Sequence, residues 1–74
     1  MSTSKGKQLV YYYNGDQTKP DVEQDLMGEV IIPANGSVIM RAGKPWEVVI
    51  VNEERFSDGR LPVFKIFLRT PQSP

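Results

Sequence analysis

The 74-residue chain contains neither cysteine nor histidine. Without cysteine it can form no disulfide and offers no thiolate as a metal ligand or nucleophile. Without histidine it lacks the side chain that titrates near neutral pH and that most often serves as general base or metal ligand. These two absences remove most of the usual catalytic and metal-binding arrangements, so we expect no metal and no other cofactor.

An excess of one charge and long apolar runs are missing as well. Nine basic residues balance nine acidic ones, which argues against the positive field that drives nonspecific binding of nucleic acid. The aliphatic run Val48–Val51 is far too short to span a membrane, and residues 1–7 are followed by no apolar signal-peptide stretch. We therefore expect a cytoplasmic protein without a membrane partner.

The apolar residues that are present favour β-strands. Val, Ile and aromatic residues number 20, against six for Leu and Ala together, and branched and aromatic side chains suit a pleated sheet better than a helix. Most glycines fall between the apolar runs, where the chain must turn through positive φ. The sequence predicts a single all-β domain over residues 8–69, with flexible segments at 1–7 and 70–74.

Turn residues divide this domain into five expected strands. The strands cover Gln8–Tyr13, Gly28–Pro33, Ser37–Arg41, Trp46–Asn52 and Pro62–Arg69. A short loop containing Gly joins the third strand to the fourth, which predicts an antiparallel hairpin. Between the first and second strands the chain is polar and begins like a capping box, so residues 19–27 form either a short helical turn or a loop.

Alternation along the last expected strand orients the sheet. Lys65 and Arg69 share one face, and Phe64, Ile66 and Leu68 share the other. By the same test Glu47 and Arg41 point outwards. The residues expected to point inwards are Phe64, Ile66, Leu68, Trp46, Val48, Ile50, Val38 and Met40.

Five short strands are too few for a sandwich and enough for a small, partly open antiparallel barrel. The stretch from Pro33 to Val51 resembles the central hairpin of SH3-like small barrels. The residues that carry this resemblance are Pro33, Gly36, Val38, Ile39, Arg41, Gly43, Lys44, Trp46, Val48, Ile50 and Val51. The resemblance implies binding of peptides, nucleic acid or partner subunits on loops and aromatic surfaces.

The fourth expected strand is apolar on both faces. Its alternation leaves Val49 and Val51 on the outer side, joined by Ile39 and by Val63 or Phe67. Such a face needs a cover, either the polar segment after the first strand or a second subunit. We therefore expect a non-enzymatic interaction module that acts as a homo-oligomer or as an accessory subunit bound to a protein partner.

Phe56 is the one aromatic residue in the charged connection Glu53–Arg60. It either plugs the loop from beneath or projects as an anchor for a partner. The candidate partner-binding residues are Val49, Val51, Phe56 and Phe67.

Two acidic features could carry chemistry. Glu53 and Asp58 could act as a carboxylate pair only in a concave pocket, which a chain of this size rarely encloses unless several copies assemble one. The carboxylates of Asp16, Asp21, Glu23 and Asp25 alternate like calcium ligands, but the segment lacks the glycine and terminal glutamate of an EF-hand loop. We assign no catalytic or metal residues and interpret the acidic segment as a solvated connection.

Three consecutive tyrosines, Tyr11, Tyr12 and Tyr13, follow Lys5 and Lys7. Aromatic rings that stack on bases and lysines that neutralise phosphates are typical of single-stranded nucleic-acid binders. Alternation places the first and third rings on one face and the middle ring on the other. We interpret the rings mainly as filling for a thin core, and single-stranded nucleic-acid binding is the alternative function.

Overall fold

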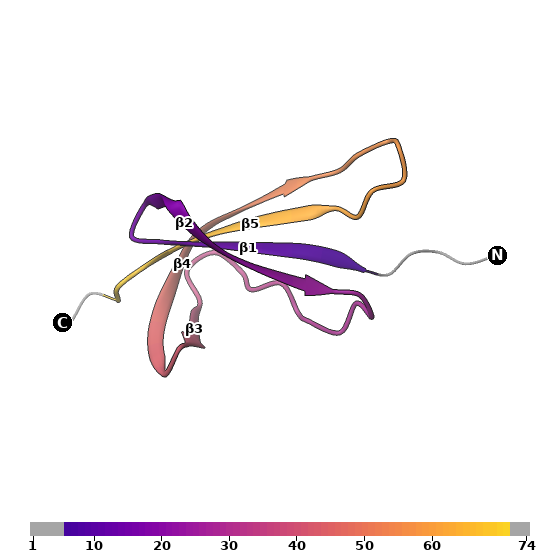
Figure 1. Cartoon of the computed structure of the whole chain (residues 1–74). Helices are drawn as coiled ribbons and strands as arrows, with labels where there is room; N and C mark the ends of the chain where they lie inside the picture. Colours follow the sequence, from indigo (N-terminus) through magenta and orange to yellow (C-terminus); the bar gives the residue numbers. More distant parts are fainter. Residues whose placement is uncertain (1–5, 72–74) are drawn as a thin grey trace.

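The computed structural model describes residues 6–71, which form one curled sheet. Its strands are β1 (Lys7–Tyr13), β2 (Asp16–Asp25), β3 (Val38–Arg41), β4 (Lys44–Glu54) and β5 (Val63–Arg69). The strands follow the order β2-β1-β5-β4-β3, and the sheet curls into a half-barrel (Figure 1). The predicted all-β fold with five strands is confirmed. None of the described residues belongs to a helix long and apolar enough to cross a membrane.

The sheet is mixed, and not purely antiparallel as predicted from the sequence. β1 and β5 lie side by side and run in the same direction, with Leu9 opposite Phe64 and Tyr13 opposite Leu68. The other strand pairs are antiparallel. Adjacent parallel strands cannot be joined by a tight turn, and here three other strands separate β1 from β5 along the chain.

The polar segment after the first strand is itself a strand, β2, and neither a helical turn nor a loop. Asn14 and Gly15 both adopt positive φ, of 54° and 76°, which is the conformation of a two-residue hairpin turn whose twist matches that of the flanking strands. The chain therefore returns directly along β1. Because β2 is at the edge of the sheet, most of its polar side chains stay in water, and an edge position also tolerates Pro20.

The predicted strand Gly28–Pro33 is wrong: these residues form turns and irregular structure. The backbone N–H of Val30 donates to the carboxylate of Asp25 over 2.8 Å, where a strand would direct it to a neighbouring strand. Val30 and Ile32 pack against the core, while Ile31 between them is 87% exposed. The segment thus covers the inner face of the half-barrel without joining the sheet.

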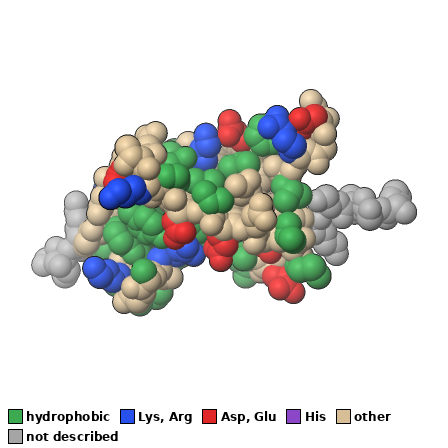
Figure 2. Space-filling model, viewed as in Figure 1, with side chains coloured by type: hydrophobic (Ala, Val, Ile, Leu, Met, Phe, Trp, Pro, Cys, Tyr) green, Lys and Arg blue, Asp and Glu red, His purple; other side chains and the backbone are tan. Residues whose placement is uncertain are grey.

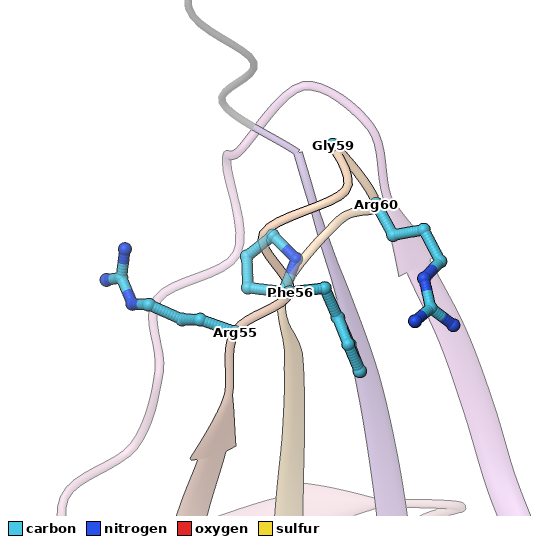
Figure 3. A pocket seen from close by; sticks show the side chains of 5 residues that line it. Arg55, Phe56, Gly59 and Arg60 are labelled. Atoms are coloured by element: carbon cyan, nitrogen blue, oxygen red, sulfur yellow. The ribbon is translucent and has the colours of Figure 1, made fainter.

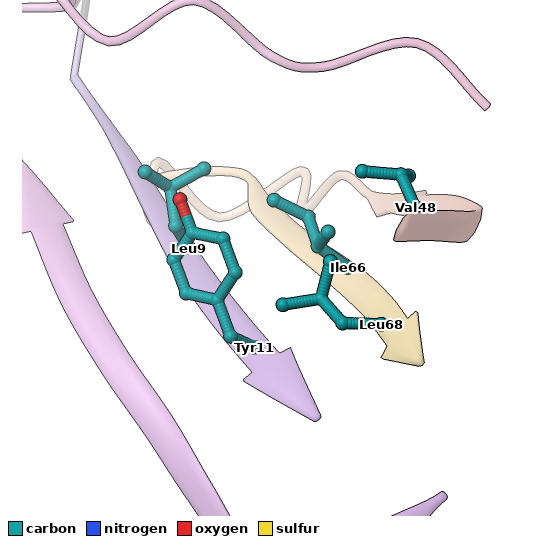
Figure 4. Close-up of a cluster of buried hydrophobic side chains, with 5 residues drawn as sticks. All are labelled: Leu9, Tyr11, Val48, Ile66 and Leu68. Atoms are coloured by element: carbon teal, nitrogen blue, oxygen red, sulfur yellow. The ribbon is translucent and has the colours of Figure 1, made fainter. Parts of the chain in front are cut away.

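The core lies on the inner face of the three central strands. Its buried members are Leu9 and Tyr11 of β1, Val48 of β4, and Ile66 and Leu68 of β5 (Figure 4). The half-buried side chains that pack against them are Tyr13, Val30, Ile32, Ile39, Trp46, Val51 and Phe64. The predicted inward orientation is confirmed for β5, for Trp46 and for Val48.

The inward orientation predicted for Ile50 is wrong, because β4 contains a bulge. Val48 lies opposite Leu68 and Ile50 lies opposite Phe67, so Val49 has no partner in the β5 ladder. One extra residue reverses the alternation beyond it. Ile50 is consequently exposed, while Val51, which was expected outside, packs against the core.

The orientation predicted for β3 is reversed along its whole length. Ile39 lies opposite Trp46, and directly opposed residues point to the same side of a sheet. Ile39 therefore points inwards with Trp46, while Val38 and Met40 are exposed on the outer face. Arg41, expected outside, points inwards as well because its charge is paired there.

Matched substitutions at two isoleucines test this register. We expect Ile66→Val to lower the free energy of unfolding by about 0.5–1.5 kcal/mol, because Ile66 is fully buried. We expect Ile50→Val to change it by less than about 0.5 kcal/mol, because Ile50 is exposed. Urea unfolding followed by the fluorescence of the single tryptophan measures both values, and equal losses would contradict the bulge.

Candidate functional site

An apolar surface runs across the outer face of the sheet. We call it the outer stripe, and it consists of Tyr12, Val22, Val49, Ile50 and Phe67. Tyr12 and Phe67 lie opposite each other on β1 and β5, and their rings stack with centroids 4.9 Å apart. Val22, Val49 and Ile50 are 51%, 46% and 43% exposed. Apolar side chains gathered on one sheet face make the outer stripe a candidate interaction surface.

The structure brings together two of the four residues expected to bind a partner. Val49 and Phe67 both lie in the outer stripe, as the sequence analysis expected. Val51 does not, because the bulge turns it towards the core. Phe56 lies in the loop between β4 and β5, where the guanidinium of Arg60 stacks over its ring at 4.2 Å.

The β4–β5 loop encloses a small hollow of about 290 Å³. Its lining includes Phe56, which is half-buried, and Arg55 and Arg60, which lie on either side of that ring (Figure 3). Arg60 pairs with Asp58 at 2.8 Å, and Arg55 pairs with Glu53. Each of the two carboxylates suggested as a catalytic pair is therefore bound to the arginine two residues further along the chain.

Arg41 of β3 links the two edge strands across the open side of the half-barrel. Its guanidinium lies 3.8 Å above the ring of Tyr11 and donates to the hydroxyl of Tyr13 over 3.2 Å. It also donates to Asp21 over 2.7 Å and to Glu23 over 3.3 Å, both on β2. We call these five residues the Arg41 network. This network was not predicted from the sequence, because alternation placed Arg41 on the outer face.

The electrostatics of the Arg41 network favour one set of protonation states. Burial raises the pKa of Tyr11 and of Tyr13, so both phenols stay neutral. The hydrogen bond from Arg41, supported by that from Tyr13, lowers the pKa of Asp21. Burial alone would lower the pKa of Arg41, but its hydrogen bonds to Tyr13 and Asp21 outweigh this effect and raise it. The network therefore holds a guanidinium against a carboxylate at neutral pH.

A second ion pair fastens the other end of the β1–β2 hairpin. The ammonium of Lys7 lies 2.6 Å from the carboxylate of Asp25, and both side chains are buried. The same carboxylate accepts the backbone N–H groups of Glu29 and Val30 over 3.0 and 2.8 Å. The hydrogen bond from Lys7, more than any other contact, lowers the pKa of Asp25 to about 2.

The residues suggested for nucleic-acid binding do not share one surface. Tyr11 is buried beneath Arg41, and Tyr13 hydrogen-bonds to Asp21 over 2.8 Å. Lys7 is paired with a carboxylate, and Lys5 lies outside the described residues. Tyr12 alone of the three tyrosines points to the outer face, where it stacks on Phe67. Nucleic-acid binding stays a prediction that this arrangement does not favour.

The acidic segment is a row of paired carboxylates on one strand. Asp16 accepts hydrogen bonds from the backbone and hydroxyl of Thr18, and the other three carboxylates belong to the two networks above. Within residues 6–71, no group of three or more acidic residues is arranged to hold a metal ion. The alternation that suggested calcium ligands places Asp21, Glu23 and Asp25 on the inner face of β2, where they pair with Arg41 and Lys7.

A further hollow of about 500 Å³ opens beside the Arg41 network. Tyr13, Asp21, Ala42, Lys44 and Trp46 line it, and the rings of Tyr13 and Trp46 lie 4.8 Å apart at 60°. The indole Nε1 of Trp46 is buried without a hydrogen-bond partner. Two of the polar side chains that line this hollow, Tyr13 and Asp21, are hydrogen-bonded to each other over 2.8 Å.

The comparisons with known proteins give no further indication of function. No protein-family model, no curated protein and no solved structure matches the chain. Basic and acidic side chains are interspersed with hydrophobic ones on the face seen in Figure 2, which is not a surface of one charge. The outer stripe is thus the strongest candidate site.

Acid titration tests the Lys7–Asp25 pair. The pKa of Asp25 is about 2 in the folded chain and about 3.9 in an unfolded one, so the ionised carboxylate stabilises the fold above about pH 4. This contribution is lost as pH falls from about 4 through 2. We expect wild-type protein to be more stable than Asp25→Asn at pH 7, and the gap to close towards pH 2. A gap independent of pH, measured by urea unfolding, would contradict this.

Removing the guanidinium tests the Arg41 network. We expect Arg41→Gln to lower the free energy of unfolding by about 1–3 kcal/mol, because charged hydrogen bonds are lost and two carboxylates remain without a cation. Arg69→Gln is the matched control, since Arg69 pairs with Glu47 at an exposed site, and its loss should be clearly smaller. Similar losses in the two variants, measured by thermal unfolding, would show that Arg41 does not hold the edges together.

Proposed function

We propose that the protein is a non-enzymatic interaction module: a small SH3-like barrel that acts as a homo-oligomer or accessory subunit and binds a protein partner through its outer stripe. The proposal includes the cytoplasmic location predicted from the sequence. One observation supports the proposed binding through the outer stripe. The inner face of the sheet is filled by the core and its cover, whereas the outer face keeps a stripe of aromatic and branched side chains in contact with water.

The composition of the outer stripe supports a protein as its partner. Stacked aromatic rings such as Tyr12 and Phe67 are rigid and bury large areas, and aromatic residues are enriched at interface centres. Ion pairs flank the stripe: Glu47 with Arg69, and Lys65 with Glu54. An apolar centre with a polar margin is the usual anatomy of a protein interface.

The surroundings of the stacked rings weigh against nucleic acid. A single-strand binder combines such rings with cations that follow the phosphate backbone. The two cations of β5 nearest Phe67 in sequence are both paired with carboxylates: Lys65 with Glu54 over 3.3 Å and Arg69 with Glu47 over 3.0 Å. The pairing of Glu53 and Asp58 with arginines likewise supports a function in binding over catalysis.

A charged substitution in the outer stripe tests the proposal. We expect Ile50→Lys to fold normally, because the side chain is exposed, and to weaken binding of a protein partner at least about 10-fold, because an interface would have to bury the ammonium. Ile31→Lys, at an exposed site outside the stripe, is the control and should bind like the wild type. Partners recovered with wild-type bait would be purified and titrated against all three proteins by calorimetry.

Two results would refute the proposal. One is a partner that binds wild type and Ile50→Lys equally, which would place its interface elsewhere. The other is salt-sensitive binding of single-stranded oligonucleotides that is lost in Tyr12→Ala, which would establish the alternative function instead.

A further inference from the structure

β3 is an edge strand with two apolar side chains open to solvent. Its described pairing is with β4 on one side, and it ends the sheet on the other (Figure 1). Val38 and Met40, which share its outer face, are 57% and 67% exposed. Unpaired backbone at a sheet edge is a template for another strand unless it is blocked.

The hairpin geometry fixes which backbone groups of β3 are unpaired. Ala42 and Gly43 have φ of 53° and 76° and form a two-residue turn, so Arg41 and Lys44 beside it are a hydrogen-bonded pair. Hydrogen-bonded pairs recur at every second residue, and the bond from Val48 N–H to the carbonyl of Ser37, 2.8 Å long, fits this alternation.

It follows that the N–H and C=O groups of Val38 and Met40 point away from β4. The residue opposite Met40 is Pro45, which has no N–H to offer the ladder. The free edge therefore presents two donors and two acceptors, each beside an exposed apolar side chain.

We propose that two copies of this chain pair through their β3 edges as antiparallel strands, related by a twofold axis at Ile39. Val38 of each copy then lies opposite Met40 of the other, and each of these two residue pairs exchanges both backbone hydrogen bonds. The apolar side chains of each pair meet on the outer face. The two sheets become one, and the outer stripes lie on the same face of it.

A second copy fits this edge because the edge is complementary to itself. Under the twofold axis the charged Arg41 lies opposite the neutral Ser37, so no like charges oppose each other. The other edge, β2, carries Lys19 and Pro20 together with its row of carboxylates, and two such strands would oppose like charges. Pairing β3 with β2 of another copy would leave free edges and give an open chain of molecules.

The short edge sets the strength of the dimer. A four-residue strand buries less than the roughly 1,200–2,000 Å² of stable interfaces, so we expect dimers near about 1 mM and monomers near about 10 μM. Two outer stripes on one sheet would let a partner bind both with increased avidity. The inference goes beyond the proposed function, since it concerns a different surface.

Residue-resolved amide hydrogen exchange by NMR, with light scattering at the same concentrations, tests the pairing. We expect the amides of Val38 and Met40 to exchange at least about 10-fold more slowly at 1 mM than at 10 μM, as the scattering mass doubles. The amides of Ile39 and Arg41, which face β4, should show no such additional slowing. Slow exchange of Val38 and Met40 at both concentrations would mean that the chain itself covers the edge, and would overturn the proposal.

Two lysine variants separate this edge from the outer stripe. Met40→Lys places an ammonium against the apolar Val38 of the other copy and should abolish the doubling of mass at 1 mM, with the fold retained because Met40 is exposed. Ile50→Lys should dimerise like the wild type even where it fails to bind a protein partner. Monomers at 1 mM in the wild type, or a dimer lost in Ile50→Lys and kept in Met40→Lys, would refute the edge pairing.

Discussion

The parallel pairing of β1 with β5 determines how the rest of the sheet is arranged. It sets Leu9 and Tyr11 beside Phe64 and Ile66 on one inner face, so that the first and last strands supply most of the buried side chains. β2 and β4 can then flank this pair only as its outer neighbours, and β3 becomes the far edge. The irregular segment between β2 and β3 crosses the inner face and covers the core, as a parallel connection requires.

Charged groups stabilise the parts of this small domain that its core does not reach. A chain of this length buries too little apolar surface for a large margin of stability. Lys7 and Asp25 join the start of β1, the end of β2 and the cover segment. Arg41 joins β3 to β1 and β2 where the sheet does not close on itself. The row of carboxylates on β2 thus serves two separate cations, both on the inner face.

Turn residues and alternation predicted the local structure correctly. The errors arose where contacts between residues far apart in sequence determine the structure. The hairpin of β3 and β4 and the inward side of β5 follow from turn residues and alternation. The bulge at Val49 could not be predicted from an apolar run, because valine is compatible with either face of the sheet. The bulge turns Val51 inwards and so removes it from the candidate site. β2 was missed because its polar residues become a strand only beside β1. Arg41 was placed outside because its partners lie about twenty residues away in sequence. Val49 and Phe67 lie on the outer face, as expected from alternation, because neither lies in the part of β4 whose orientation the bulge reverses.

The central parallel pair also determines how the molecule responds to tension. Gln8 lies opposite Val63 and Tyr13 opposite Leu68, so the chain enters β1 at one end of the sheet and leaves β5 at the other. A force applied between these two points pulls neighbouring strands past each other lengthwise. The hydrogen bonds between them are then loaded together in shear, whereas a hairpin pulled from its open end separates one bond at a time. Pulling the chain between these two points would therefore have to break this central ladder as a unit.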